Sequence, residues 1–326
     1  MSRYLMRRLG FLLLTLLLTS LVVFTITQWL PGDICRVILG REVGENALEA
    51  CRQELGLNRP LPFQYLSWIG KLLTGDWGLA FSTRSLIFPL VMDRLGNSLM
   101  LALVTLVISV PLAVTLGSIA GLNENKPVDG TISVFSLAVV GLPEFVTGIL
   151  LIQFFSFGLR QRGLPALPAS SALPPDASFL EALPMLILPS LTAMLVLLAY
   201  IVRLTRAGVI EELKRPYVRT AVLKGLPRRT VILKHIMRNA LLPTITVIAI
   251  SFGWLISGLV VIENVFNYPG LGRLLVFAID RRDLPLIQAV TMVTVLGFAL
   301  ANLAADLLYA LLNPRIRFGQ EDNHNN

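Results

Sequence analysis

The amino-acid sequence predicts an all-α, polytopic membrane protein that crosses the bilayer six times. Of its 326 residues, 55% are hydrophobic and only 15% are charged, whereas soluble domains carry roughly a quarter charged residues. The mean hydropathy is +0.72. Six runs with almost no charge are each long enough to cross the hydrocarbon layer, which takes about 20 apolar residues. These observations place the chain in the membrane class.

The six runs are residues 9–32, 95–123, 130–159, 182–202, 239–262 and 284–305. The third contains one carboxylate, Glu144. The first follows Arg3, Arg7 and Arg8, as a secretory signal would. It is longer than the apolar region of a typical signal and lacks a clear small-x-small cleavage site, so we expect a retained helix.

Lys and Arg are distributed unequally between alternate connecting segments. With the N-terminus inside, the inner segments carry 16 Lys/Arg and 6 Asp/Glu, and the outer segments carry 12 of each. This asymmetry predicts cytoplasmic N- and C-termini by the positive-inside rule. It also accounts for the net charge of +8 without nucleic acid as a partner.

The sequence predicts one sizeable outer segment, residues 31–94. Residues 45–57, "ENALEACRQELGL", have apolar residues at helical spacing and predict an amphipathic helix that ends near Gly56. Residues 59–81 mix Pro, Gly and Trp, and Trp68 and Trp77 would suit the membrane surface. Residues 160–181 predict a Pro- and Ser-rich loop, and residues 316–326 a disordered tail.

The two cysteines of the chain, Cys35 and Cys51, both fall in this outer segment. In an oxidising compartment they could form a disulfide, which would contribute about 3 kcal/mol in the chain-entropy model. Two buried free thiols are the alternative, and the sequence leaves both open.

The most informative segment is residues 203–238, which carries ten basic and two acidic residues. Residues 211–225, "EELKRPYVRTAVLKG", predict a helical stretch that stops at Gly225, because Gly is favoured just past a helix end. Pro227 can begin the next helix, whose apolar residues recur at one face. The segment therefore predicts helix, turn, helix between the fourth and fifth spans.

Residue types within this segment resemble the EAA loop of ABC importer permeases, in its dipeptide/oligopeptide form. The matching residues are Tyr217, Arg219, Thr220, Ala221, Lys224, Gly225 and Leu226, followed by Arg238, Asn239, Ala240 and Pro243. Arg219 stands at the Glu position of the general pattern, and the spacing from Gly225 to Pro243 is longer than in sugar permeases. Both departures resemble the peptide subfamily.

Other motifs extend the resemblance over nearly the whole chain. They are "LPGD" at residues 30–33, "ELGLNRPLPFQYLSWI" at 54–69, "GDWGLAF" at 75–81, "ENVFNYPGLGRLL" at 263–275 and "DLLYALLNPRIR" at 306–317. The resemblance implies a type I ABC importer permease fold. Residues 1–94 would form the first span and outer segment, residues 95–315 the permease core with a coupling helix within 204–238, and residues 316–326 the tail.

The resemblance implies a permease subunit in a bacterial inner membrane that imports di- or oligopeptides, or else nickel complexes, glutathione or opine-like solutes. Its partners would be a second homologous permease, in a heterodimer, two ATP-binding subunits and a periplasmic substrate-binding protein. The sequence has no G-x-x-x-x-G-K-S/T phosphate loop, so ATP and Mg would bind to the partner subunits. We expect this chain to bind no cofactor or metal and to have no catalytic residues.

The resemblance also implies site residues. Those expected to couple the chain to the ATPase are Tyr217, Arg219, Thr220, Ala221, Lys224, Gly225 and Arg228. Those expected at the periplasmic gate or binding-protein side are Glu263, Pro269, Gly270 and Gly272, with an ordinary turn between spans as the alternative.

Glu144 and its neighbour Pro143 suggest a further hypothesis from the residues themselves. A carboxylate within the hydrocarbon costs a few kcal/mol and normally faces a cavity or a partner. Glu144 could line the translocation path, or it could make a structural hydrogen bond to a partner subunit.

The rival class is a self-contained secondary transporter. That class predicts internal inverted repeats and several intramembrane charges. The chain has no convincing repeat, and only Glu144 and Asp306 fall within the predicted spans.

Overall fold

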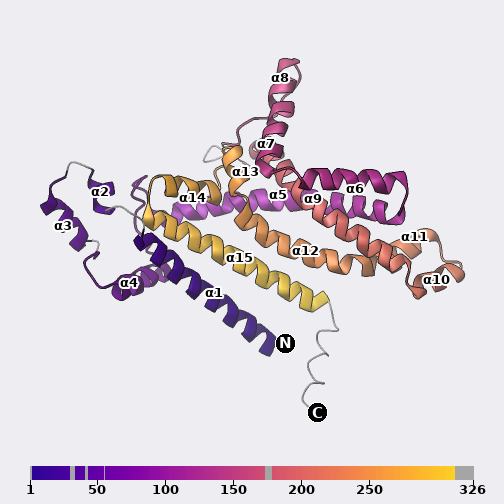
Figure 1. Ribbon diagram of the computed structural model, residues 1–326, viewed down its shortest axis with the longest axis horizontal. Helices are drawn as coiled ribbons and strands as arrows, with labels where there is room; N and C mark the ends of the chain where they lie inside the picture. Colours follow the sequence, from indigo (N-terminus) through magenta and orange to yellow (C-terminus); the bar gives the residue numbers. More distant parts are fainter. Residues whose placement is uncertain (1, 30–33, 41–42, 55, 173–177, 313–326) are drawn as a thin grey trace, which may run out of the picture. The chain divides into compact units, whose positions relative to one another are not determined.

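The computed structural model describes residues 2–29, 34–40, 43–54, 56–172 and 178–312 of the protein (Figure 1). These residues are predominantly helical, and within them the sole strand-like pairing is an isolated bridge between Leu79 and Leu86. The predicted all-α class is confirmed.

The helical elements follow one another along the chain with short connections. They are α1 (Ser2–Trp29), α2 (Ile34–Leu39), α3 (Glu45–Glu54), α4 (Leu61–Thr74), α5 (Ile87–Leu122), α6 (Pro127–Val140), α7 (Glu144–Ile152), the π-helix η1 (Gln153–Gly158), α8 (Leu159–Gln161), α9 (Phe179–Leu213), α10 (Pro216–Leu223), α11 (Arg228–Thr230), the π-helix η2 (Val231–Ile236), α12 (Met237–Gly258), α13 (Val260–Val265), α14 (Leu271–Asp280) and α15 (Leu284–Leu312).

Five helical segments of the described chain are long and apolar enough to cross a membrane. They are Met6–Trp29, Ile87–Leu122, Leu180–Leu213, Arg228–Leu255 and Leu284–Leu307. A sixth candidate is the pair Pro127–Val140 and Glu144–Gln161, if this bent pair counts as one span. Many large apolar side chains on these segments are exposed, such as Leu13, Val107 and Phe154, as contact with lipid requires.

The third predicted run, residues 130–159, is not one straight helix. The axes of α6 and of the helical segment that begins at Glu144 differ by 102°, and α7 projects away from α6 (Figure 1). The physical cause is Pro143, which lacks an amide hydrogen and disfavours helical geometry at the preceding residue. Pro143 has φ −58° and ψ 142° and stands at the N-cap of α7.

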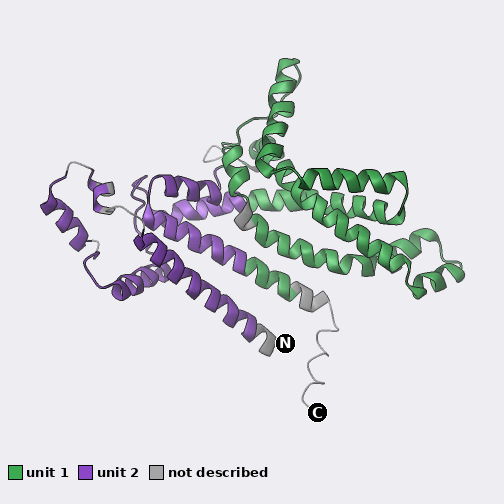
Figure 2. Ribbon diagram, viewed as in Figure 1, with its two compact units in different colours: residues 1, 99–268, 300–326 green, residues 2–98, 269–299 purple. Residues whose placement is uncertain are grey.

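The structure divides into two compact units, each with its own apolar core (Figure 2). Unit 1 contains Leu99–Tyr268 and the chain from Leu300, and unit 2 contains Ser2–Ser98 and Pro269–Ala299. Helices α5 and α15 therefore contribute residues to both units.

Helix α9 is the centre of unit 1, because α6, α7 and α12 all pack against it. Three glycines allow close approach to α9 from its neighbours. A Cβ atom on Gly117 would lie 2.7 Å from Cβ of Thr205, and one on Gly121 would lie 2.7 Å from Cβ of Val209. Small residues at such contacts are how membrane helices pack closely.

The closest of these contacts joins α9 to α12. A Cβ atom on Gly208 would lie only 2.5 Å from the carbonyl oxygen of Ala240. Because that atom belongs to the backbone, it cannot move aside as a flexible side chain could. A glycine is therefore required at position 208.

In unit 2, the loop that follows α4 is fixed to the start of α15. Both the backbone N–H and the hydroxyl of Ser82 donate to Oδ2 of Asp283, at 2.8 and 2.7 Å.

The amphipathic helix predicted before Gly56 is observed as α3, which ends at Glu54, and Gly56 has φ +68°.

We predict that Gly208→Ala lowers the thermal unfolding midpoint of the detergent-solubilised protein. The added methyl group forces α9 and α12 apart, at a cost of about 1–3 kcal/mol. Gly130→Ala is the matched control, since a Cβ atom there meets nothing within 4 Å and Ala is the better helix former. Equal midpoints for the two variants would contradict this packing.

Candidate functional site

The basic segment 203–238 forms a short helix between the ends of two long ones. Helix α9 ends at Leu213, and α10 begins at Pro216. The expectation of one unbroken helical stretch up to Gly225 is wrong in this respect. Pro216 disfavours helical geometry at Arg215, which has φ −71° and ψ 140°.

The end of α10 is a tight turn of the Schellman type. The N–H of Leu226 donates to the carbonyl of Ala221, and the N–H of Gly225 donates to the carbonyl of Val222, at 3.3 and 3.0 Å. This motif needs a left-handed residue after the helix, and Gly225 has φ +75°. Pro227 then stands at the N-cap of α11, so the predicted helix, turn, helix arrangement is observed.

One face of α10 is buried against the protein's own helices. Val218 and Ala221 pack in a cluster with Val209 of α9, Ala240 of α12, Val231 and Ile236. Ala221 therefore makes its close contacts within the chain, and its side chain is not available to a partner. The small residue lets α10 lie directly on the ends of two long helices.

The remaining predicted residues of the segment are exposed. Arg219, Thr220, Lys224, Gly225 and Arg228 lie on the surface, and so does Arg229. The same turn exposes three apolar side chains, Val222 (59%), Leu223 (78%) and Leu226 (38%). We call these three the tip patch.

The tip patch was not anticipated from the sequence. Apolar residues beside basic ones on an exposed surface are typical of a protein interface. A signal was available, because Leu223 lies two residues past Ala221 and so falls off the buried stripe of α10.

Tyr217 fixes the start of α10 to the helices on either side. Its hydroxyl donates to a carboxylate oxygen of Glu212, and it accepts a hydrogen bond from Nδ2 of Asn239 at 3.0 Å. It also lies 3.2 Å from the carbonyl oxygen of His235. Burial and the hydrogen bond to Glu212 raise the pKa of Tyr217, so its hydroxyl stays protonated as a donor. The sequence pattern included Tyr217 and Asn239 but did not reveal Glu212.

Residues predicted on the outer side are largely buried. Glu263 is 1% exposed, and its carbonyl accepts the N–H of Tyr268 at 2.8 Å. In unit 2, the carbonyl of Pro269 accepts from Nδ2 of Asn97 at 2.9 Å. Gly270 is the buried N-cap of α14, and Gly272 in the first turn is half-buried.

The carboxylate predicted within a span, Glu144, begins α7 directly after the exposed Pro143. Its side chain is half-buried. Within the described part of the chain, no side chain or backbone group donates a hydrogen bond to it.

Cys35 and Cys51 are joined by a disulfide, with their Cα atoms 5.9 Å apart. The bond ties α2 to α3, and Arg36 pairs with Glu45 across the same two helices at 3.0 Å.

Several helices long and apolar enough to cross a membrane define the class of the chain as an integral membrane protein. Two families match the sequence. The family described as "Binding-protein-dependent transport system inner membrane component" matches residues 113–318. Its N-terminal companion, "Binding-prot-dependent transport system membrane comp, N-term", matches residues 1–102.

Curated relatives match the chain over nearly its whole length. The "Glutathione transport system permease protein GsiC" of Escherichia coli K12 is 38% identical over 318 residues, which are 98% of this chain and 100% of that protein. The "Probable peptide ABC transporter permease protein y4tP" of Sinorhizobium fredii is 37% identical over 319 residues, with the same coverage.

Among solved structures, the chain is similar to one described as "Crystal structure of an amino acid ABC transporter with histidines". The TM-score is 0.51 at 18% identity, over 70% of this chain and 94% of that one. This likeness shows the fold. The chain belongs to the family of binding-protein-dependent transport system inner membrane components. It is a permease subunit of an ABC importer, of the peptide/oligopeptide family, and a multi-pass inner-membrane protein.

We predict that Tyr217→Phe speeds backbone amide exchange in α10. The lost hydroxyl leaves the side chains of Glu212 and Asn239 without this partner, at a cost of about 1–1.5 kcal/mol. Tyr200→Phe is the control, because Tyr200 is 47% exposed and its ring contacts Arg203 by a cation–π interaction. Unchanged exchange in α10 of the Tyr217→Phe variant would contradict the role of this hydroxyl.

We also predict that neither cysteine of the purified, denatured protein reacts with a thiol-alkylating reagent until a reductant is added. Reduction should lower stability by about 3 kcal/mol in the chain-entropy model, given the sequence separation of 16. Mass spectrometry reads the alkylation directly. Two alkylated cysteines without reductant would mean that the bond is absent.

Proposed function

We propose that this chain pairs with a second permease of the same family and forms the path by which di- or oligopeptides, or a glutathione-like solute, enter the cell. Two separate subunits hydrolyse ATP with Mg, and a binding protein delivers the solute from outside. The exposed tip patch, on a helix α10 whose other face packs against α9 and α12, is the observation that carries this proposal. The relatives named for glutathione and peptide transport support the substrate class.

The tip patch is suited to a groove on an ATPase subunit. Leu223, with 78% of its side chain exposed, can serve as an apolar anchor. Arg219 of α10, Lys224 at its C-cap and Arg228 of α11 are also exposed and can pair with acidic groups around such a groove. Charges at the rim mainly set orientation and association rate, so we assign most of the binding energy to the apolar residues.

Movement of α10 can be transmitted to membrane-spanning helices, because its buried face packs against two of them. Val218 and Ala221 pack with residues of α9 and α12, and both helices include candidate spans. A displacement of α10 by the ATPase therefore pushes on two spans at once. Tyr217 adds hydrogen bonds to Glu212 and Asn239, which resist rotation of α10 on its base.

The orientation that this function requires has the basic segment and both termini in the cytoplasm. The excess of Lys and Arg on the inner segments supports it. Glu263, Pro269, Gly270 and Gly272 then lie on the binding-protein side. Because three of them are buried, we assign them to shaping that side rather than to direct contact with the binding protein.

Glu144 is our candidate for the translocation path. Its half-buried carboxylate stands beside Pro143 at a helix bend, where α7 could face a water-filled passage. We predict that Glu144→Gln reduces uptake severalfold in proteoliposomes that contain the complete transporter. Normal uptake by this variant would exclude a role of the charge in the path.

A substitution at Gly225 provides the sharpest test of the coupling role that we propose for the basic segment 203–238. We predict that Gly225→Val leaves the protein inserted but uncouples ATP hydrolysis from uptake, because a β-branched residue at φ +75° costs on the order of 1–3 kcal/mol. Gly225→Asn is the control, since Asn tolerates this backbone region. ATP-driven uptake of labelled dipeptide and glutathione is the measurement, and full uptake by Gly225→Val would place the joint elsewhere.

A further inference from the structure

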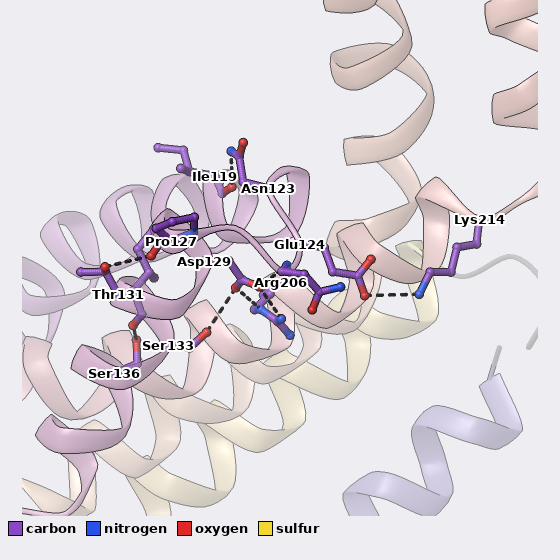
Figure 3. Close-up of polar contacts among 12 residues, drawn as sticks. Ile119, Asn123, Glu124, Pro127, Asp129, Thr131, Ser133, Ser136, Arg206 and Lys214 are labelled. Carbon is purple, nitrogen blue, oxygen red and sulfur yellow. Dashed lines mark hydrogen bonds and ion pairs between the residues drawn. The ribbon is translucent and has the colours of Figure 1, made fainter.

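A charged pair away from the tip patch joins α6 to α9 (Figure 3). Asp129, in the first turn of α6, accepts two hydrogen bonds from Arg206 of α9. Nε of Arg206 donates to Oδ1 at 2.5 Å, and Nη2 donates to Oδ2 at 2.7 Å. The two hydrogen bonds make this a bidentate ion pair. Only 5% of the Asp129 side chain is exposed, so its carboxylate is buried where α6 contacts α9.

The carboxylate of Asp129 is also held from its own side. The backbone N–H of Asn125 donates to Oδ2 at 3.1 Å, and the hydroxyl of Ser133 donates to Oδ1 at 3.3 Å. These two hydrogen bonds therefore orient the Asp129 carboxylate independently of Arg206. A carboxylate fixed in this way dictates the position of the planar guanidinium that forks onto it.

Arg206 lies within the basic segment 203–238, close in sequence to α10. Arg206 lies on α9, which ends at Leu213, and α10 begins three residues later at Pro216. A second link on the same side joins Lys214 to Glu124 at 3.4 Å (Figure 3), with both side chains substantially exposed. The connection from α5 to α6 is thus tied to the base of α10.

From Asp129 the chain continues toward helices α7 and α13 of the same unit. Helix α6 leads through the bend at Pro143 to α7. A Cβ atom on Gly148 of α7 would lie 3.2 Å from the rings and methyl groups of Phe266 and Val265. The bent pair of helices therefore runs from the inner charged pair to the end of α13.

We propose that Asp129 is a positioning residue for transport. By holding Arg206, it makes α6 move with α9 when an ATPase displaces α10, so that the bent pair α6 and α7 responds to ATP. This inference rests on the proposed function of the basic loop.

The chemistry of the pair suits this role better than a purely stabilising one. Apolar packing alone would keep α6 against α9 but would tolerate sliding along the axis. A bidentate fork fixes the position along the axis as well. Buried ion pairs are weak evidence for stability, because desolvation offsets much of the attraction. Fixed geometry is thus the property that this pair supplies most clearly.

The test uses the complete transporter in proteoliposomes, with ATPase activity and uptake of labelled solute measured on the same preparation. We expect Asp129→Asn and Arg206→Gln each to retain assembly and ATPase activity while solute imported per ATP falls about tenfold, which is within the range of measured coupling energies. The double variant should fall no further than either single variant. Glu45→Gln is the matched control, because its pair with Arg36 is exposed, lies in the other unit and contributes little.

Each other result overturns the inference. Unchanged import per ATP in Asp129→Asn would show that the pair does not transmit movement. Loss of the assembled complex, or a drop in ATPase activity that equals the drop in uptake, would show that Asp129 only maintains structure. If the unaltered transporter shows no ATP-dependent uptake of peptide or glutathione, the proposed function fails instead.

Discussion

The close packing of helices against α9 is the constraint on which unit 1 depends. Gly117, Gly121 and Gly208 remove the side chains that would otherwise keep α5 and α12 at a distance. Association of helices in lipid cannot rely on the hydrophobic effect, because the surrounding chains are equally apolar. Close contact therefore supplies the attraction, and it brings α9 and α12 near enough for one short helix to rest on both.

The two faces of α10 differ in their surroundings, and we propose that they have separate tasks. Val218 and Ala221 hold the helix on its base, and Tyr217 adds hydrogen bonds to the base on either side. The other face, with the tip patch and its basic neighbours, is exposed, as the contact that we propose with an ATPase subunit requires. Since Gly225 ends the helix in a left-handed turn, the tip patch is held on a short, defined element.

Several features followed from the sequence because they depend on local residue types. Apolar runs without charge predicted most of the long helices, and Gly225 and Pro227 predicted the turn within the basic segment 203–238. The bend at Pro143 was missed because hydropathy averages over a run and ignores one missing amide hydrogen. Asp129 and Arg206 are 77 residues apart, so each looked like an ordinary charge of an inner segment. The exposure of Leu223 likewise depends on which face of α10 packs against α9.

Contact between the tip patch and an ATPase subunit is the central claim, and site-specific photo-crosslinking tests it most directly. A benzoyl-phenylalanine at position 223 should cross-link to the ATP-binding subunit in membranes that contain the complete transporter. The same group at position 73, where Leu73 is 81% exposed in the outer segment, should not. No cross-link from position 223, or an equal one from position 73, would contradict the claim.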